Sequence, residues 1–176
     1  MAKYQEKFFQ GERSLFAEKG AEIIRTTFGH GESPLKESSD ISLKDSIFKW
    51  KYPLWYSDHI KVDHTVFEEM SRSGIWYTHD IEIVNSSLQA PKLFRRSSRI
   101  SLKNDHFSDA AETLWNCSDI KIENVTANGD YFGMNSENIY VDHLDLIGNY
   151  IFDGGKISKC TIRILFPRML FGTVKM

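Results

Sequence analysis

The stretch "ETLWNCSDIKIENV", residues 112–125, contains the pattern that decides the fold. Apolar and charged residues alternate in it, so Ile120 and Ile122 fall on one face of an extended segment. Lys121 and Glu123 fall on the opposite face. Such alternation is typical of a half-buried β-strand rather than of a helix. The alternating part, "IKIENV", begins at Ile120, and we call this first residue its anchor.

Related segments recur along the chain at regular intervals. The segments "AEII", "ISLKDS", "IKVDHT", "IEIVNS", "ISLKND", "IKIENV" and "IYVDHL" begin at the anchors Ala21, Ile41, Ile60, Ile81, Ile100, Ile120 and Ile139. The numbers of successive anchors differ by 20, 19, 21, 19, 20 and 19. A repeat of this length indicates a solenoid, in which each unit buries its apolar face only against its neighbours.

Two more apolar columns keep the same register. Seven residues after the anchors stand Phe28, Phe48, Phe67, Leu88, Phe107, Ala127 and Leu146. Six residues before them stand Leu15, Leu35, Leu54, Ile75, Phe94 and Leu114, with Gly133 in the seventh unit. Three inward columns in each unit predict an all-β protein, a right-handed parallel β-helix of about seven coils of 19–21 residues.

Leucine-rich repeats are the competing solenoid, because their range of lengths includes a period of this size. Their motif is L-x-x-L-x-L-x-x-N, whereas "LWNCSDIKIEN" reads L-x5-I-x-I-x-N, and no segment has a helical period. Four residues after the anchors stand Arg25, Asp45, His64, Asn85, Asn104, Asn124 and His143. Asparagine and aspartate suit a left-handed bend between strands, and stacked asparagines can hydrogen-bond along the ladder.

The composition is that of an ordinary soluble chain. Its formal net charge is -2 and 41% of its residues are apolar, which does not favour nucleic acid as a partner. The start "MAKYQEKFFQGER" has no apolar stretch of signal-peptide length, and no window approaches the roughly 18 apolar residues of a membrane span. Cys117 and Cys160 form no metal or disulfide spacing. We therefore expect a cytoplasmic protein with no membrane contact, no metal and no cofactor.

The run "GESPLKES…FKWKYPLWYS…RSGIWYT…FRRS…ETLWNCSDIKIENV…GDYFGMNS" resembles a bacterial family classed as a domain of unknown function. The resemblance covers roughly Gly11 to Lys156. It implies a single-stranded right-handed β-helix of the pectate-lyase-like superfamily and a cytoplasmic bacterial setting. It supplies no catalytic residues, because the family has no established reaction. Members of this kind tend to be longer than this chain.

An unusual set of side chains lies just before the anchors, and we call it the aromatic–basic stripe. It consists of Lys36, Trp55, Tyr56, Trp76, Tyr77, Arg95, Arg96 and Trp115. Neighbouring coils lie about 4.8 Å apart, so Trp55 should stack on Trp76, and Arg95 should lie beside Trp76 and Trp115. If the column six before the anchor faces inward, the tryptophans face outward. An exposed stripe of this kind predicts a binding surface for an oligo- or polysaccharide, or else a self-supporting ladder that stiffens the solenoid.

Hydrolysis of a sugar chain would need a pair of carboxylates. The candidates are Glu12 and Glu32, which share a column on adjacent coils, together with Glu37 and Asp130. Each of these four carboxylates is equally consistent with a solvent-exposed turn residue that has no catalytic role. The histidines fall at bends and turns, and Cys117 occupies a column of small turn residues. The sequence therefore leaves open whether the protein is an enzyme, and a non-enzymatic scaffold or interaction solenoid is the alternative function.

The last segment, "KISKCTIRILFPRMLFGTVKM", departs from the repeat after Lys156. The next anchor is due at positions 158–160, where the chain has "SKC", which is not expected to continue the strand. One extra A after codon 156 lets permitted codons read "KNIEMHN", with an isoleucine at position 158, and later "DAFWNCEN", which matches "ETLWNCSDI". We therefore expect a solenoid domain over residues 1–156 and an out-of-frame tail over residues 157–176. The resulting truncated, open end of the solenoid would favour self-association.

Overall fold

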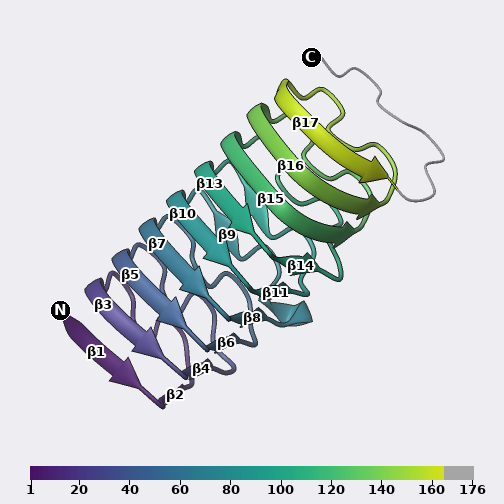
Figure 1. The fold of residues 1–176 in the computed structure, drawn as a ribbon. Coiled ribbons are helices and arrows are strands. Elements are labelled where there is room, and N and C mark those ends of the chain that lie inside the picture. Colours follow the sequence, from purple (N-terminus) through teal and green to yellow (C-terminus); the bar gives the residue numbers. More distant parts are fainter. Residues whose placement is uncertain (165–176) are drawn as a thin grey trace.

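The computed structural model describes residues 1–164, which form a parallel β-solenoid of about eight turns. Figure 1 shows the long strands stacked side by side along the solenoid, with N-terminal β1 at one end and β17 at the other. All strand pairs are parallel. The predicted parallel β-helix is confirmed. The described residues contain no α-helix, only the single 3-10 turn η1 (Glu69–Ser71), and a leucine-rich repeat is excluded.

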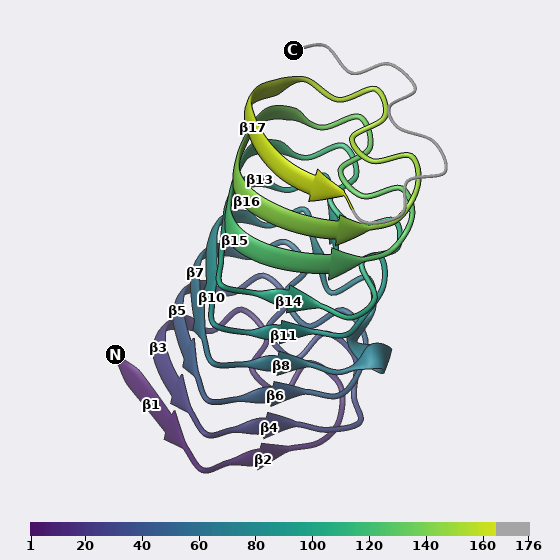
Figure 2. The same cartoon turned by 45° about the vertical axis from the view of Figure 1, so that its right-hand side comes forward.

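The first six coils each contribute a long strand and a short strand to one sheet, whereas β15 and β16 run without a break through both positions. The long strands are β1 (Ala2–Gln5), β3 (Lys19–Ile24), β5 (Ser39–Lys44), β7 (Asp58–Asp63), β10 (His79–Val84), β13 (Ser98–Lys103), β15 (Ser118–Asn128), β16 (Glu137–Ile147) and β17 (Ile157–Ile164). The short strands, which form a second face in Figure 2, are β2 (Phe8–Phe9), β4 (Thr27–Phe28), β6 (Ile47–Phe48), β8 (Val66–Phe67), β11 (Ser87–Leu88) and β14 (His106–Phe107). On a third side, β9 (Ile75–Trp76) pairs with β12 (Phe94–Arg95).

The register of the long strands confirms every predicted anchor. Ala21, Ile41, Ile60, Ile81, Ile100, Ile120 and Ile139 are consecutive Cα partners. One further coil precedes them, because Ala2 pairs with Ala21. This coil was not predicted because its strand, "AKYQ", has no isoleucine at either of its inward positions, Ala2 and Tyr4.

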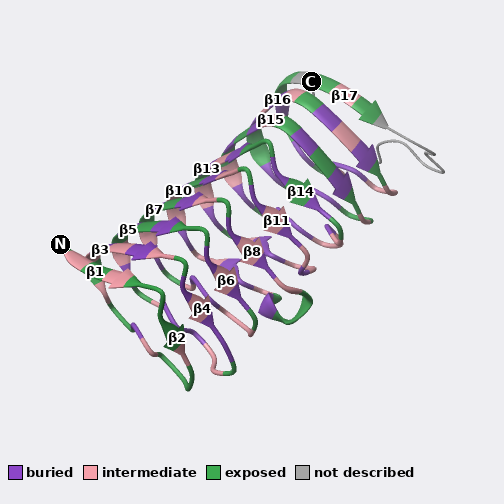
Figure 3. Cartoon of the chain, turned by 60° about the horizontal axis from the view of Figure 1, so that its bottom comes forward, coloured by how far each residue is buried: buried purple, intermediate pink, exposed green. Residues whose placement is uncertain are grey.

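The three inward columns form one continuous core, and Figure 3 shows buried residues recurring in coil after coil along the solenoid. In the column seven after the anchor, Phe48 stacks between Phe28 and Phe67 with ring-centroid distances of 4.7 and 4.9 Å. Gly133 interrupts the column six before the anchor, where a Cβ would lie 2.2 Å from the Phe152 ring. Phe152 therefore fills the space that a leucine side chain occupies in the earlier coils.

The bend four residues after the anchor has the predicted left-handed geometry. Every member of the column has a positive φ, from 46° at Arg25 to 59° at His143. The asparagines also hydrogen-bond along the solenoid: the side-chain amide of Asn104 donates to Asn85 at 3.2 Å, and that of Asn124 donates to Asn104 at 2.9 Å. The predicted asparagine ladder is therefore confirmed.

Two columns of small polar residues are buried at the corners. Three residues before the anchors, Ser57, Ser97 and Ser136 donate to main-chain carbonyls of the preceding coil at 2.8, 2.9 and 2.6 Å. Five residues after the anchors, Thr26, Ser46, Thr65 and Ser86 form a similar ladder. Asp105 ends this second ladder and accepts hydrogen bonds from the main-chain N–H groups of Ser86 and Lys103. Burial raises the pKa of Asp105 to about 7.

The residues after Lys156 continue the sheet, although irregularly. The expectation that "SKC" cannot continue the strand is wrong: Lys159 pairs with Tyr140, and Cys160 with Val141. Main-chain hydrogen bonds need no particular side chain, so a non-repeating segment can still add to the ladder. Its register with β16 shifts twice, whereas the other strand pairs within residues 1–164 keep theirs. The remainder of the expected out-of-frame tail, residues 165–176, lies outside the described residues.

Candidate functional site

The inner half of the aromatic–basic stripe is a continuous stack of flat groups. Trp55 and Trp76 are stacked with centroids 5.4 Å apart and an interplanar angle of 9°. The Arg95 guanidinium lies 4.6 Å from the Trp76 ring and 4.9 Å from the Trp115 ring. All four side chains are half-buried. The stacking order predicted from the repeat is therefore confirmed.

The indole N–H groups bind the solenoid wall. Those of Trp76 and Trp115 donate to the main-chain carbonyls of Lys92 and Tyr131 at 2.9 and 2.6 Å, and that of Trp55 donates to the carbonyl of Ser73. Each bond reaches a main-chain carbonyl of the next coil. The tryptophans therefore join neighbouring coils, which is what a stiffening ladder requires.

Both faces of the Trp76 ring are covered, because it lies between Trp55 and Arg95. Tyr52 contacts Trp55 with ring centroids 4.5 Å apart and a tilt of 45°. A sugar ring needs a free aromatic face to stack on. Sugar stacking, the binding mode that flat aromatic side chains suggested, is therefore blocked at Trp76.

The outer half of the stripe presents polar groups, with Tyr56 and Arg96 exposed and Tyr77 half-buried. We use the name outer column for the residues four before the anchors from Ile41 onward, which are Glu37, Tyr56, Tyr77, Arg96, Asn116 and Asn135. Tyr56 is 49% exposed and stacks on Tyr77 at 4.8 Å. Lys36 lies 5.5 Å over the Tyr56 ring, and Arg96 lies 6.0 Å over the Tyr77 ring.

Arg95 has one weak ion pair and one unsatisfied donor. Its Nη2 lies 3.8 Å from Oε2 of Glu112, which also pairs with Lys92 at 3.2 Å. Its Nε is buried and has no hydrogen-bond partner among the described residues. Stacking between two indoles therefore contributes most of what holds this guanidinium in place.

The aromatic surface is longer than the sequence indicated. Tyr131 contacts Trp115 edge-on at 6.3 Å and stacks on Tyr150 at 4.8 Å, so aromatic rings continue toward the C-terminal end of the solenoid. Tyr52 extends the surface in the other direction. Tyr52 and Tyr131 lie eight residues before their anchors, and Tyr150 lies eight before the anchor position expected at 158. Inspection of that column in the sequence would have found all three.

The four candidate carboxylates do not form one site. Glu32 on the second coil pairs with Lys51 at 3.6 Å, and its main-chain carbonyl accepts a hydrogen bond from the residue that follows Glu12. Glu37 pairs with Lys36 at 3.6 Å. Asp130 accepts hydrogen bonds from the main chain and side chain of Asn149 at 2.7 and 2.9 Å. Of the four, only Glu37 lies next to the stripe, directly after Lys36, so within residues 1–164 these candidates place no pair of carboxylates at the stripe.

Cys117 is a structural residue of the buried hydroxyl column. Its side chain is 2% exposed, and burial raises the pKa of its thiol to about 12. Its main-chain N–H donates to the Ser136 hydroxyl at 2.9 Å, as a serine at this position would. A thiol that stays protonated at neutral pH is a poor nucleophile, in agreement with the predicted turn role.

Comparisons with known proteins place the chain in a family. No curated protein sequence matches it significantly. Among solved structures, it is similar to HetL, a pentapeptide repeat protein involved in heterocyst differentiation regulation from the cyanobacterium Nostoc sp. strain PCC 7120, with 11% identity and a TM-score of 0.39. That match covers 88% of this chain and 73% of HetL. Within residues 1–164, no helix is long and apolar enough to span a membrane.

A family model matches residues 2–164, which include nearly all of the solenoid described above. The match begins with the coil of β1 and ends with β17. The chain therefore belongs to the family described as "Protein of unknown function (DUF3737)".

Proposed function

We propose that the protein binds an acidic oligo- or polysaccharide through the outer column of the aromatic–basic stripe. The observation that carries the proposal is the backbone conformation of Tyr56, Tyr77 and Arg96, whose φ angles are 56°, 58° and 49°. A large side chain in this left-handed region costs roughly 1–2 kcal/mol, whereas asparagine tolerates it well. The next two coils have asparagine there, Asn116 and Asn135.

Three successive coils thus have, at this left-handed position, a residue that is unfavourable there, although asparagine would be favourable. Large left-handed residues such as Arg25 and Tyr131 occur at other bends too, so the strain supports a functional role only together with the polar groups that Tyr56, Tyr77 and Arg96 present. The Tyr56 and Tyr77 hydroxyls and the Arg96 guanidinium make no hydrogen bond or ion pair to the described part of the chain. They are free to meet a ligand from solvent.

The chemistry of these groups indicates the class of ligand. Phenol hydroxyls can exchange hydrogen bonds with sugar hydroxyls, and a guanidinium engages a carboxylate through two parallel hydrogen bonds. Coils repeat about every 4.8 Å, so an extended chain along the solenoid axis would meet one side chain of the outer column per coil. The resemblance to pectate-lyase-like solenoids also favours a sugar polymer. In this proposal the tryptophans support the column rather than contact the sugar.

Substitution by asparagine tests the proposal without disturbing the fold. Tyr77→Asn and Arg96→Asn should each weaken binding of an oligouronate by at least about tenfold, because each removes hydrogen bonds worth about 1.5 kcal/mol or more. Calorimetry with an oligouronate and with a neutral oligosaccharide of the same length measures this. Melting temperatures should not fall, since asparagine is better suited to the conformation.

Arg25→Asn is the matched control, because Arg25 is an exposed arginine with φ 46° at another corner. It should bind the oligouronate like the wild type. If the wild type binds neither sugar, or if the stripe variants bind as well as Arg25→Asn does, the proposal is wrong and the stripe is only a stiffening ladder of a scaffold protein.

We also infer that the chain from residue 157 onward is out of frame. The support is the register of β17, which shifts against β16 between Ile139 and Tyr140 and again between Asp142 and Leu144. In the restored frame, an isoleucine at position 158 and a methionine at position 160 would face Ile139 and Val141 with the regular spacing of the repeat. Both shifts would then be unnecessary.

Sequencing of the gene tests the frame. We expect one A too few in the run after codon 156, and in the restored frame a tryptophan codon at position 172 within "DAFWNCEN". Independent sequencing of the genomic DNA then distinguishes a true deletion from a reading error. An intact run whose alternative frame lacks those codons would refute the inference.

A further inference from the structure

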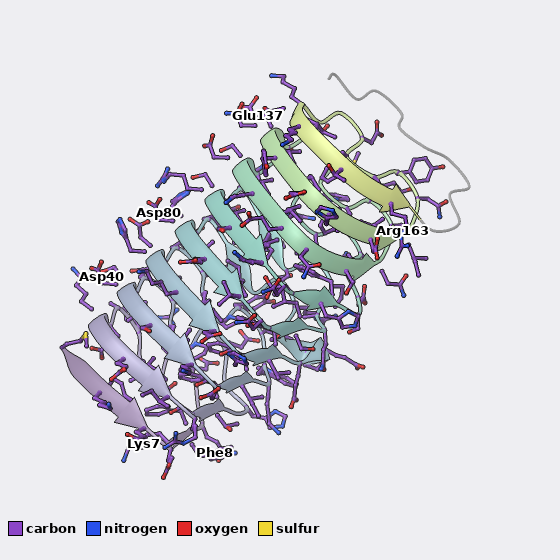
Figure 4. All side chains as sticks on the ribbon, viewed as in Figure 1. Lys7, Phe8, Asp40, Asp80, Glu137 and Arg163 are labelled. Carbon is purple, nitrogen blue, oxygen red and sulfur yellow. The ribbon has the colours of Figure 1, made fainter. Side chains whose placement is uncertain are left out.

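A second group of chemically competent side chains lies on another corner, where the long strands begin. Asp58 and His59 start β7, and Asp80 lies one coil further along in β10. Figure 4 shows Asp40 and Asp80 projecting from this edge of the solenoid, well clear of its core. From the sequence, His59 was expected near a turn and no metal was expected, since no metal-ligand spacing was found.

The solenoid brings these three residues together. Ligand atoms from Asp58, His59 and Asp80 all lie within 4.8 Å of one another, and within residues 1–164 no other histidine, cysteine or acidic residues form such a group of three. The His59 ring lies between the two carboxylates, with Nδ1 3.3 Å from Asp58 and Nε2 3.8 Å from Asp80. All three side chains reach solvent, so an ion can enter without any opening of the fold.

We propose that Asp58, His59 and Asp80 bind a divalent transition-metal ion of the zinc type, through one carboxylate oxygen from each aspartate and one imidazole nitrogen. Zinc accepts such oxygen and nitrogen ligands at about 2.0–2.2 Å, and three protein ligands leave a fourth position open. Ligand atoms around a tetrahedral zinc are about 3.4 Å apart, so these atoms need to approach one another by at most about 1.4 Å, which side-chain rotation supplies.

The open coordination position would face a groove of about 670 Å³ that lies across the exposed face of β5, β7, β10 and β13. His59 and Asp80 lie on its wall, and Lys61 and Ser42 also line it. A water molecule or an anionic group in the groove would complete the coordination of the ion, and Lys61 adds a positive charge to the same groove.

Arg99 opposes metal binding and makes the proposal testable. Its guanidinium holds both oxygens of Asp80, which orients the carboxylate but places a positive charge beside the ion. The same contact holds the pKa of Asp80 below its ordinary value. A carboxylate keeps further lone pairs when it is bound by arginine, so Asp80 can still coordinate. If this corner carried only surface ion pairs, the pair of Arg99 and Asp80 would be the strongest of them. Removing Arg99 would then not strengthen metal binding.

Two other aspartate–histidine pairs serve as matched controls. Nδ1 of His64 lies 2.6 Å from Asp63, and Nδ1 of His143 lies 2.7 Å from Asp142, but neither pair has a third ligand among the described residues. His59, His64 and His143 have φ angles of 52°, 46° and 59°, so asparagine suits all three positions. Replacing each of them removes one imidazole while preserving the backbone conformation.

Titration of the purified full-length chain with Zn²⁺ by calorimetry, and with Co²⁺ by visible absorption, tests the site. We expect one tight ion per chain. His59→Asn, Asp58→Asn and Asp80→Asn should each weaken it by at least about tenfold, as expected for loss of a ligand. His64→Asn and His143→Asn should bind like the wild type, and Arg99→Gln should bind more tightly. Mg²⁺ and Ca²⁺, which prefer oxygen ligands alone, should not compete.

Three results would overturn the proposal. The first is wild-type protein without a one-to-one complex, and the second is an equal loss of affinity in His59→Asn and in the two control variants. The third is weaker binding in Arg99→Gln, which would show that the corner acts as an ion-pair ladder. Circular dichroism of each variant at the titration temperature confirms that the solenoid is folded.

Discussion

Replacing Phe48 by alanine should lower the free energy of unfolding by about 3–5 kcal/mol, the range for a buried phenylalanine. Phe48 is 0% exposed and has a ring stacked on each side, Phe28 at 4.7 Å and Phe67 at 4.9 Å. The backbone ladders on both sides keep the coils at a constant spacing, so the cavity cannot collapse. Urea unfolding followed by circular dichroism measures the loss, which corresponds to a fall in melting temperature of roughly 6–20 °C.

Two variants control this experiment. Phe48→Leu should cost less than about 2 kcal/mol, because Leu88 and Leu146 fill the same column in other coils. Phe8→Ala should change stability by no more than about 0.5 kcal/mol, since Phe8 is 62% exposed. A loss below about 1 kcal/mol for Phe48→Ala would mean that neighbouring coils relax into the cavity, contrary to the rigid ladder described here.

The second large effect is a dependence of stability on pH through Asp105. Burial raises its pKa from 3.8 to about 7 in the folded protein. Because the folded state holds this proton more tightly than the unfolded state does, the contribution of Asp105 to stability is largest below pH 4. It is lost as the pH rises to about 7. Three pKa units correspond to about 4 kcal/mol, as an order of magnitude.

Asp105→Ser removes the titrating group and restores the hydroxyl found at Ser46 and Ser86 in the same ladder. The stability of this variant relative to the wild type should therefore rise by about 4 kcal/mol between pH 4 and pH 8. Denaturant unfolding at both pH values measures it. Asp63→Ser is the control with the opposite sign, because the Asn85 side-chain amide lowers the pKa of Asp63. A constant difference between Asp105→Ser and the wild type would contradict the prediction.

The coil arrangement was predictable because a solenoid converts sequence spacing directly into spatial contact. Residues one repeat apart become neighbours, so the stacking of Trp55 on Trp76 and the position of Arg95 followed from counting. The coil of Ala2 was missed because its strand lacks the isoleucine pattern. The continuation of the sheet into β17 was missed because main-chain pairing does not require the repeat.

The chemistry of the stripe was less predictable. Whether a ring face is free depends on its tilt and on its neighbours, and the repeat contains no information on either. Tyr52 contacts the ring of Trp55, although it is not in the same column. The backbone strain at Tyr56, Tyr77 and Arg96 likewise appears only as a φ angle. The residues proposed to contact the sugar are therefore those of the outer column and not the tryptophans.

The sequence alone determined the fold class, the register and the three core columns, because each coil repeats the same local pattern and buries it against a similar neighbour. Only the tertiary structure decided which polar groups meet between coils. Asp58, His59 and Asp80 come together because a corner of one coil lies beside the corner of the next, and side-chain orientation, rather than sequence spacing, sets the distances between their ligand atoms.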